Sequence, residues 1–206
     1  MQTTIVEYVK QCTNCKRANV HGGSQDHGLL PTRTLKTVNP FDVVHVDLIG
    51  PYDDGYYGIT IIDQGTRWLE VGIQADKSAL KTAEIFDHEW LCRYPRPREV
   101  VHDQGTEFTG AEFQEIFSSY GIKDKPITAK NPQVNAICER VHLELLNIIR
   151  CYEDVDWKKA IYYAAFAVRA RYHGILNALS GQLLFGQYVI SRRIGAICQN
   201  GVLTQS

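Results

Sequence analysis

The sequence predicts an α/β fold in which a mixed five-stranded sheet is flanked by helices. Three β-rich segments follow one another before any helical pattern, and two further strand segments then alternate with helices. Strands in close succession favour antiparallel hairpins, whereas strands separated by helices favour crossover connections within one sheet. Together these patterns indicate one layered domain.

The first three strands are expected at residues 41–49, 56–62 and 68–73. They are rich in β-branched and aromatic residues, and Gly50-Pro51 ends the first of them. Residues 63–65, Asp-Gln-Gly, provide a hairpin turn between the second and the third. The three strands are therefore predicted to pair antiparallel.

A helix is predicted next, at residues 78–92. Ser78 is a favourable N-cap residue, and the helix must end before Pro95. A short strand follows at residues 99–102.

A second helix is predicted to begin at Thr109, because Glu112 three residues later completes a capping box. Gly121 should end this helix. Residues 122–127 then form a strand at an edge of the sheet, since Pro126 lacks the N–H group that a central strand needs.

The clearest helical pattern covers residues 133–152, where apolar side chains recur every three or four positions. These side chains are Val134, Ile137, Val141, Leu145, Ile148 and Tyr152. Two more helices are expected at residues 156–171 and 180–185. Up to residue 171 the order is β-β-β-α-β-α-β-α-α, which is that of the ribonuclease-H-like architecture.

Composition divides the chain into four parts. Residues 21–40 are rich in glycine, proline, serine and threonine, which is typical of a linker. They separate a short N-terminal piece, residues 1–20, from the main domain at residues 41–190. Residues 191–206 form a divergent or truncated tail.

Charge alone does not decide the function. The formal net charge is −1, and residues 1–40 carry five basic side chains against two acidic ones, which leaves −4 for the rest. A core of this kind indicates that tight binding to DNA comes largely from elsewhere. The longest apolar stretch, residues 160–168, is too short to cross a bilayer, so no membrane partner is expected. Six unevenly spaced cysteines do not predict a disulfide framework.

Three acidic residues are candidates for catalysis. Asp47 lies within an apolar strand, where an uncompensated carboxylate is costly. Asp103 ends a strand, and the strand ends of open α/β sheets are where binding and active sites usually lie. Glu139 lies off the apolar stripe of its helix. Taken singly, they also fit ordinary roles as a strand-end aspartate, a turn aspartate and a solvated helix glutamate.

The spacing of the three acids favours a joint role. There are 55 residues between Asp47 and Asp103 and 35 between Asp103 and Glu139, and the predicted fold brings the three together. Converging carboxylates repel one another unless divalent cations neutralise them. Oxygen ligands suit Mg²⁺ or Mn²⁺, and two such ions about 4 Å apart support in-line displacement at phosphorus. The acids therefore predict phosphodiester chemistry.

The segments around these acids carry a resemblance to a known family. Asp47 lies in VDLIGP, Asp103 in HDQGTEF and Glu139 in NPQVNAICER. These segments and their spacing resemble the catalytic core of retroviral and gypsy-like retrotransposon integrases, and the resemblance covers roughly residues 4–190. Ala178-Leu179-Ser180 departs from it, because the family generally has Thr-Pro there.

The resemblance implies an enzyme, an integrase that is a polynucleotidyl transferase. Asp47 and Asp103 would hold two Mg²⁺ or Mn²⁺ ions between them, and Glu139 would complete one site. Water would remove nucleotides from the 3′ ends of an element's DNA, and the freed hydroxyl would attack target DNA in strand transfer. The resemblance also implies a homo-oligomer, because two DNA ends must be joined, and a nuclear location, with the cytoplasm as a second one.

Polar residues before and along the helical face of Glu139 are candidates for contact with DNA. They are Lys130, Asn131, Gln133, Asn135, Arg140 and His142. Lysine and arginine suit phosphates, whereas asparagine and glutamine suit bases or sugars. The alternative is that these residues form a solvated start of the helix.

Cys12 and Cys15 form half of a zinc site. Their surroundings resemble the end of the family's His-His-Cys-Cys domain, so residues 1–20 are interpreted as a remnant of it. His21 and His27 follow the cysteines and do not fit that order. Zn²⁺ is therefore expected only if two histidines lie upstream.

Three functions remain open from the sequence. The first is DNA integration. The second is a nuclease or transposase of the same fold, because a fold does not fix a function, although QGTEF and NPQ favour integrase. The third is a catalytically silent, host-retained or decaying relic that binds nucleic acid or protein. The missing zinc histidines and the lack of a recognisable C-terminal DNA-binding module motivate the third, and the survival of all three acids opposes it.

Overall fold

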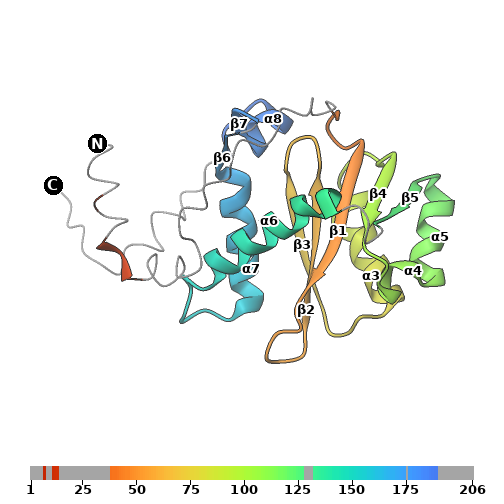
Figure 1. The fold of residues 1–206 in the computed structure, drawn as a ribbon, viewed down its shortest axis with the longest axis horizontal. Coiled ribbons are helices and arrows are strands. Elements are labelled where there is room, and N and C mark those ends of the chain that lie inside the picture. Colours follow the sequence, from red (N-terminus) through yellow and green to blue (C-terminus); the bar gives the residue numbers. More distant parts are fainter. Residues whose placement is uncertain (1–6, 8–10, 14–37, 128–131, 175, 190–206) are drawn as a thin grey trace.

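The computed structural model describes residues 7, 11–13, 38–127, 132–174 and 176–189 (Figure 1). Its main sheet has five strands in the order β3-β2-β1-β4-β5. The strands are β1 (Val43–Ile49), β2 (Tyr57–Asp63), β3 (Leu69–Gln74), β4 (Glu99–His102) and β5 (Lys123–Pro126). β1 to β3 pair antiparallel, whereas β1, β4 and β5 pair parallel, so the sheet is mixed as predicted. The predicted fold class is confirmed.

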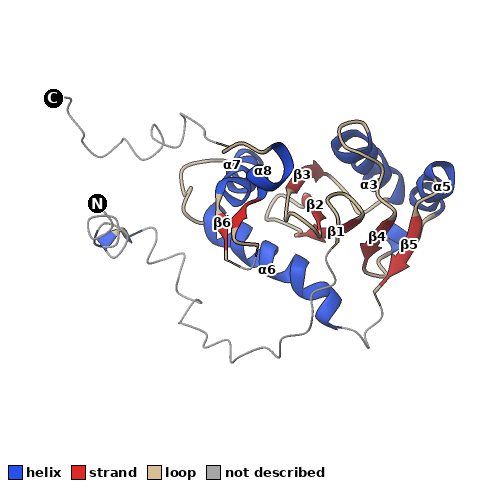
Figure 2. Cartoon of the chain, turned by 90° about the horizontal axis from the view of Figure 1, so that it is seen from above, coloured by secondary structure: helices blue, strands red, loops and turns tan. Residues whose placement is uncertain are grey.

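Helices cover both faces of this sheet (Figure 2). On one face lie α3 (Ala79–Phe86), the π-helical turn η1 (Asp87–Leu91) that continues it, α4 (Thr106–Thr109) and α5 (Ala111–Tyr120). On the other lie α6 (Pro132–Ile149) and α7 (Trp157–Ala170). A pair of two-residue strands, β6 (Tyr172–His173) and β7 (Ala178–Leu179), leads into α8 (Ser180–Phe185).

The alternation of side chains along β1 decides which residues face which helices. Val44 and Val46 pack in the cluster beneath α3 and α5, whereas Ile49 packs in the cluster beneath α6 and α7. Because successive side chains of a strand point to opposite faces, Asp47 lies on the same face as Ile49. The carboxylate therefore faces the layer that contains α6.

The start of α5 differs from the prediction. Thr109 ends the short helix α4 instead of capping a helix, and its hydroxyl donates to the carbonyl of Gly105 at 3.1 Å. α5 begins after Gly110, whose extended backbone separates the two helices. A Cβ atom at Gly110 would lie 2.3 Å from the Cβ of Ala79, so the close approach of α3 decides where the break falls. The capping box was therefore a wrong prediction.

Other local predictions agree with the structure. Ser78 caps α3 by accepting a hydrogen bond from the Lys81 N–H at 3.3 Å, and Gly121 ends α5 in the left-handed conformation. β5 is an edge strand that contains Pro126. The short pair β6–β7 was not predicted, because two residues are too few to show a period.

The predicted terminal parts fall mostly outside the described residues. The N-terminal piece at residues 1–20, most of the linker at 21–40 and the tail at 191–206 therefore remain predictions. Among the helices that are described, none is long and apolar enough to cross a membrane.

Leu145→Ala is expected to destabilise the domain, because Leu145 is 0% exposed and joins α6 to the core beneath it. Truncation of a buried leucine costs about 2–5 kcal/mol in the free energy of unfolding, which urea denaturation measures. Leu143→Ala on the same helix is the matched control, since Leu143 is 53% exposed. The control should change the free energy by less than about 0.5 kcal/mol. Equal effects of both variants would contradict the packing of α6.

Candidate active site

Asp47 and Asp103 come together through the parallel pairing of β1 with β4. Val43 pairs with Glu99 and His45 with Val101. When this register is extended by two residues, Asp103 falls beside Asp47. Asp103 is exposed just beyond the end of β4, whereas the side chain of Asp47, inside β1, is only 19% exposed. The two aspartates thus form an acidic pair at one end of the central strands.

Backbone N–H groups orient both carboxylates. The N–H of Leu48 donates to Oδ1 of Asp47 at 2.8 Å, and the N–H of Gly105 donates to Oδ1 of Asp103 at 3.0 Å. The ring of His102 contacts the carbonyl of Asp103 and the carboxylate of Asp124 on β5. These contacts fix the turn that carries Asp103.

Asp47 is also supported from β2 and α6. The Thr60 hydroxyl donates to the carbonyl of Asp47 at 3.2 Å and lies 2.7 Å from Nε2 of His142. Since that hydroxyl has one proton, Nε2 of His142 is the donor in the second contact. Nδ1 of His142 lies 3.8 Å from Oδ2 of Asp47. Burial lowers the pKa of His142 to about 4, so the ring is neutral near pH 7 and does not balance the charge of Asp47.

The electrostatic environment opposes ionisation of Asp47. Burial, followed by the neighbouring charge of Asp103, raises the pKa of Asp47 to about 7. The hydrogen bond from Leu48 and the ammonium group of Lys77 act in the opposite direction, and Glu107 adds a further raising effect. The site therefore has an excess of negative charge that the protein itself does not neutralise.

Glu107 is a third carboxylate beside the two aspartates, and its sequence position predicted no role for it. It is 3% exposed, and Oε1 lies 3.3 Å from Nζ of Lys77. A Cβ atom at Gly105 would lie 2.6 Å from its Cδ, so glycine at position 105 makes room for this carboxylate. The glutamate of HDQGTEF was visible in the sequence, but a glutamate in the first turn of a helix usually indicates a solvated residue.

Glu139 lies on α6 and is exposed. Its neighbour Cys138 is buried, and burial raises the pKa of the thiol, with smaller raising effects from Asp47, Glu139 and Asp103 and an opposing one from Arg67. The three predicted acids thus all lie within electrostatic range of one buried thiol. However, no three histidine, cysteine, aspartate or glutamate side chains in the described part of the chain lie close enough to hold one metal ion. The structure gathers the two aspartates and leaves Glu139 on the adjacent helix.

The other predicted site residues are only partly described. Lys130, Asn131 and Cys15 lie outside the described residues. Gln133 and Asn135 belong to α6, but only their backbone is described. Cys12 is partly exposed, Arg140 is exposed and His142 faces the domain interior. The roles predicted for these residues in binding zinc or DNA remain predictions.

The sheet order and the acidic pair define a ribonuclease-H-like domain with an acidic site at the end of its central strands. Residues 38–132 match the family described as integrase core domain. The resemblance to retroviral-type integrase cores is thereby confirmed.

Known relatives and solved structures agree with this result. The chain is 27% identical over 194 residues to the retrovirus-related Pol polyprotein from transposon 412 of Drosophila melanogaster. The matched region covers 91% of this chain and 15% of that protein. It is 27% identical over 137 residues to the gypsy retrotransposon integrase-like protein 1 of Homo sapiens, covering 64% of this chain and 25% of that protein. The chain thus spans a small part of the relatives it matches.

Two solved structures share the fold. The HTLV-2 integrase catalytic core domain, solved in complex with magnesium in a trimeric form, superimposes with a TM-score of 0.60 at 18% identity, over 70% of this chain and 96% of that one. The catalytic core domain of BIV integrase gives a TM-score of 0.60 at 17% identity, over 69% of this chain and 93% of that one. At this identity the likeness concerns the fold.

Asp47→Asn is expected to stabilise the protein when no divalent cation is present. The ordinary pKa of 3.8 rises to about 7 in the folded chain, so ionisation of Asp47 opposes folding increasingly between about pH 4 and pH 7. In urea unfolding with a chelator, the variant should have the higher free energy of unfolding at about pH 8. This gain should shrink as the pH falls toward about 4.

Asp53→Asn is the control for this measurement, because Asp53 is an exposed aspartate before β2. It should reproduce neither the gain nor its dependence on pH. A variant at position 47 that is less stable than the unaltered protein at about pH 8 would show that Asp47 is compensated within the fold.

Proposed function

We propose that this chain performs DNA integration as a metal-dependent polynucleotidyl transferase. The supporting observation is the pair Asp47 and Asp103, which is partly buried, rich in negative charge and built from oxygen ligands alone. Such ligands fit Mg²⁺ or Mn²⁺. The match to the integrase core domain and the magnesium complex of the HTLV-2 core are consistent with this assignment.

The roles of the acids follow from their positions. Asp47 and Asp103 would hold two divalent ions between them, and Glu139 would approach from α6 to complete one of the two sites. When bound, the ions would activate water or a 3′ hydroxyl as nucleophile and stabilise the leaving oxygen. The acids would thus serve 3′ end processing and strand transfer at the same site.

The neighbours of Asp47 would position it. Thr60 holds the carbonyl of Asp47, and His142 holds the Thr60 hydroxyl, so both constrain the direction of the carboxylate. Lys77 lowers the pKa of Asp47, but its ion-pair partner Glu107 raises that pKa more strongly. We infer that this pair leaves the negative charge of the aspartates to be neutralised by cations.

DNA would lie across the face that carries Arg140, which is exposed one residue after Glu139. Lys130, Asn131, Gln133 and Asn135 precede it in the sequence and would extend the contact along the start of α6. His142 is better placed to orient Asp47 than to reach a phosphate, because its ring contacts Thr60 inside the domain. A DNA substrate of this kind would place the protein in the nucleus.

The second candidate is a silent relic that binds nucleic acid or protein. Among the described residues, Glu139 is not gathered with the two aspartates into a group that could hold an ion, and this observation favours it. A relic would keep the fold and the acidic pair but would not complete the metal site.

The deciding experiment is Mn²⁺-dependent reversal of strand transfer on a branched, pre-joined DNA substrate. Unaltered protein should resolve the branch, and Glu139→Gln should lower the rate by about a hundredfold or more. Mutation of residues that only hydrogen-bond to metal ligands already lowers metal affinity or activity by about 10–100-fold. Glu153→Gln, in the turn between α6 and α7, is the matched control and should retain the rate.

Two results would contradict active integration. If Glu139→Gln and the unaltered protein resolved the branch equally fast, Glu139 would not be a metal ligand. If neither protein acted while both bound Mn²⁺ in calorimetry, the relic would be the better description.

A homo-oligomer is expected, because the joining of two DNA ends requires at least two active sites. Light scattering of the purified chain at high concentration should give a mass of at least twice 23.4 kDa. A mass of one chain at every concentration would contradict this expectation.

A further inference from the structure

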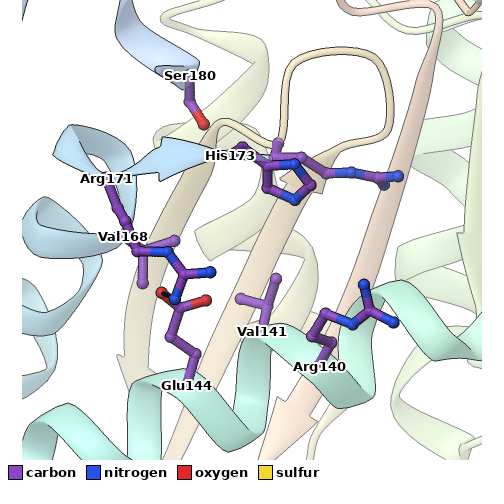
Figure 3. A pocket seen from close by; sticks show the side chains of 8 residues that line it. Arg140, Val141, Glu144, Val168, Arg171, His173 and Ser180 are labelled. Atoms are coloured by element: carbon purple, nitrogen blue, oxygen red, sulfur yellow. Dashed lines mark hydrogen bonds and ion pairs between the residues drawn. The ribbon is translucent and has the colours of Figure 1, made fainter. Parts of the chain in front are cut away.

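A small pocket lies between α6, the end of α7, β6 and the start of α8, and none of the three acids lines it (Figure 3). Its volume is about 30 Å³. The side chains that line it are Arg67, Arg140, Val141, Glu144, Val168, Arg171, His173 and Ser180. Arg140 lines the pocket from α6, and Arg171 extends from the end of α7 to Glu144 (Figure 3).

Positive charge predominates in this pocket. Arg67, Arg140 and Arg171 line it together with a single carboxylate, that of Glu144. Glu144 accepts a hydrogen bond from Arg171, so this pair neutralises itself. Arg67 and Arg140 remain without a carboxylate among the lining residues. Three positive charges against one negative charge leave a local surplus of two.

Asp63 reduces this surplus, because its charge raises the pKa of Arg67, but it does not line the pocket. Its Oδ1 accepts a hydrogen bond from the N–H of Phe41 at 2.9 Å. Its Oδ2 accepts from the N–H and the hydroxyl of Thr66 at 2.8 and 2.6 Å. These bonds direct the Asp63 carboxylate toward Phe41 and Thr66, neither of which lines the pocket.

Two buried polar atoms at the pocket have no hydrogen-bond partner in the described protein. They are Nη1 of Arg67 and Nδ1 of His173. Buried polar atoms without partners are rare, because each loses its hydrogen bonds to water on folding. Nδ1 of His173 is a donor in the tautomer that carries the proton on this nitrogen. Burial lowers the pKa of His173, and the three arginines Arg67, Arg171 and Arg140 lower it further, which reflects the positive potential in the pocket. Both unsatisfied atoms therefore lie where an anionic oxygen would be stabilised.

The backbone of Arg67 adds a second sign of a specialised position. Its φ is +63°, a left-handed conformation that residues with a Cβ rarely adopt. The turn holds it there through a hydrogen bond from the Arg67 N–H to the carbonyl of Asp63 at 2.9 Å. The turn before β3 thereby presents an arginine, where glycine is favoured, to the side of α6.

We propose that this pocket binds one phosphate group through Arg67, Arg140 and His173. A cavity needs about 10–15 Å³ to hold one water. The pocket of about 30 Å³ therefore accepts the projecting oxygens of a phosphate and excludes a whole nucleotide. Arginine guanidinium groups match such oxygens in geometry and charge.

The source of the phosphate follows from the position of Arg140, next to Glu139 on α6. A DNA strand held at the acidic site would pass Arg140 on the exposed side of this helix, so a backbone phosphate of that strand is the expected ligand. This part of the inference rests on the proposed function. Free phosphate presents the same oxygens, so it is a probe of the pocket that does not depend on catalysis.

The first test is thermal unfolding of the full chain in sodium phosphate against sodium chloride at equal ionic strength. Phosphate should raise the unfolding midpoint of the unaltered protein, because a ligand that binds only the folded state stabilises it. Arg140→Gln should weaken phosphate binding by about tenfold, since hydrogen bonds between charged groups are stronger than those between neutral groups. Arg150→Gln, an exposed arginine just beyond α6 that does not line the pocket, is the matched control and should keep the full response.

Arg67→Gly is a second variant that removes the guanidinium group without disturbing the turn, because glycine adopts positive φ without strain. It should also lose the response to phosphate. Equal responses in the unaltered protein, Arg140→Gln and Arg67→Gly would overturn the pocket as a phosphate site, even if strand transfer is intact.

The second test distinguishes DNA from free phosphate. Anisotropy of a labelled DNA duplex is measured over a range of salt concentrations. Each lost phosphate contact lowers the slope of the logarithm of the binding constant against the logarithm of the salt concentration by about one. A lower slope for Arg140→Gln and Arg67→Gly, but not for Arg150→Gln, supports a backbone phosphate in the pocket. Unchanged slopes with a lost phosphate response would overturn DNA as the source. If the unaltered protein showed no strand transfer but phosphate still raised its unfolding midpoint, the result would count against the proposed function alone.

Discussion

The parallel pairing of β1 with β4 is the constraint on which the rest of the site depends. It sets two aspartates side by side, one of them inside a strand and mostly buried. Neither like charge nor burial favours two ionised carboxylates there, and both raise the pKa of Asp47. The fold tolerates this arrangement because sheet pairing and two hydrophobic layers stabilise the strands independently of the site. The resulting excess of negative charge is what gives the site its affinity for divalent cations in our proposal.

Helix α6 carries residues of opposite charge at adjacent positions. Glu139 lies within electrostatic range of the Cys138 thiol, as do the two aspartates, and Arg140, the next residue, lines the pocket with Arg67 and His173. Cys138 lies buried beside them, where the acids and Arg67 have opposing effects on its pKa. A helix places consecutive residues about 100° apart, so adjacent positions can serve different sites. One helix therefore connects the proposed catalytic acid to the proposed phosphate contact.

Most of the fold was predictable because hydrophobic periodicity directly records which faces are buried. The five strands and the helices α3, α6, α7 and α8 were predicted from the sequence, and Pro126 predicted the edge position of β5. The break between α4 and α5 did not follow, because it depends on the contact of Gly110 with Ala79, which is distant in the sequence. Among the site residues, Glu107 was overlooked for a similar reason. Its burial depends on space beside Gly105 that no pattern reveals.

The sequence by itself determined the family resemblance, the fold class and the three candidate acids. The spacing of the acids and the residues that flank them can be read directly from the linear sequence. Only the tertiary structure decided that Asp47 and Asp103 are neighbours while Glu139 is not gathered with them. It alone brought arginines from a turn, from α6 and from the end of α7 into one pocket. Electrostatic potential depends on distances in space, and those distances arise only when separate elements pack together.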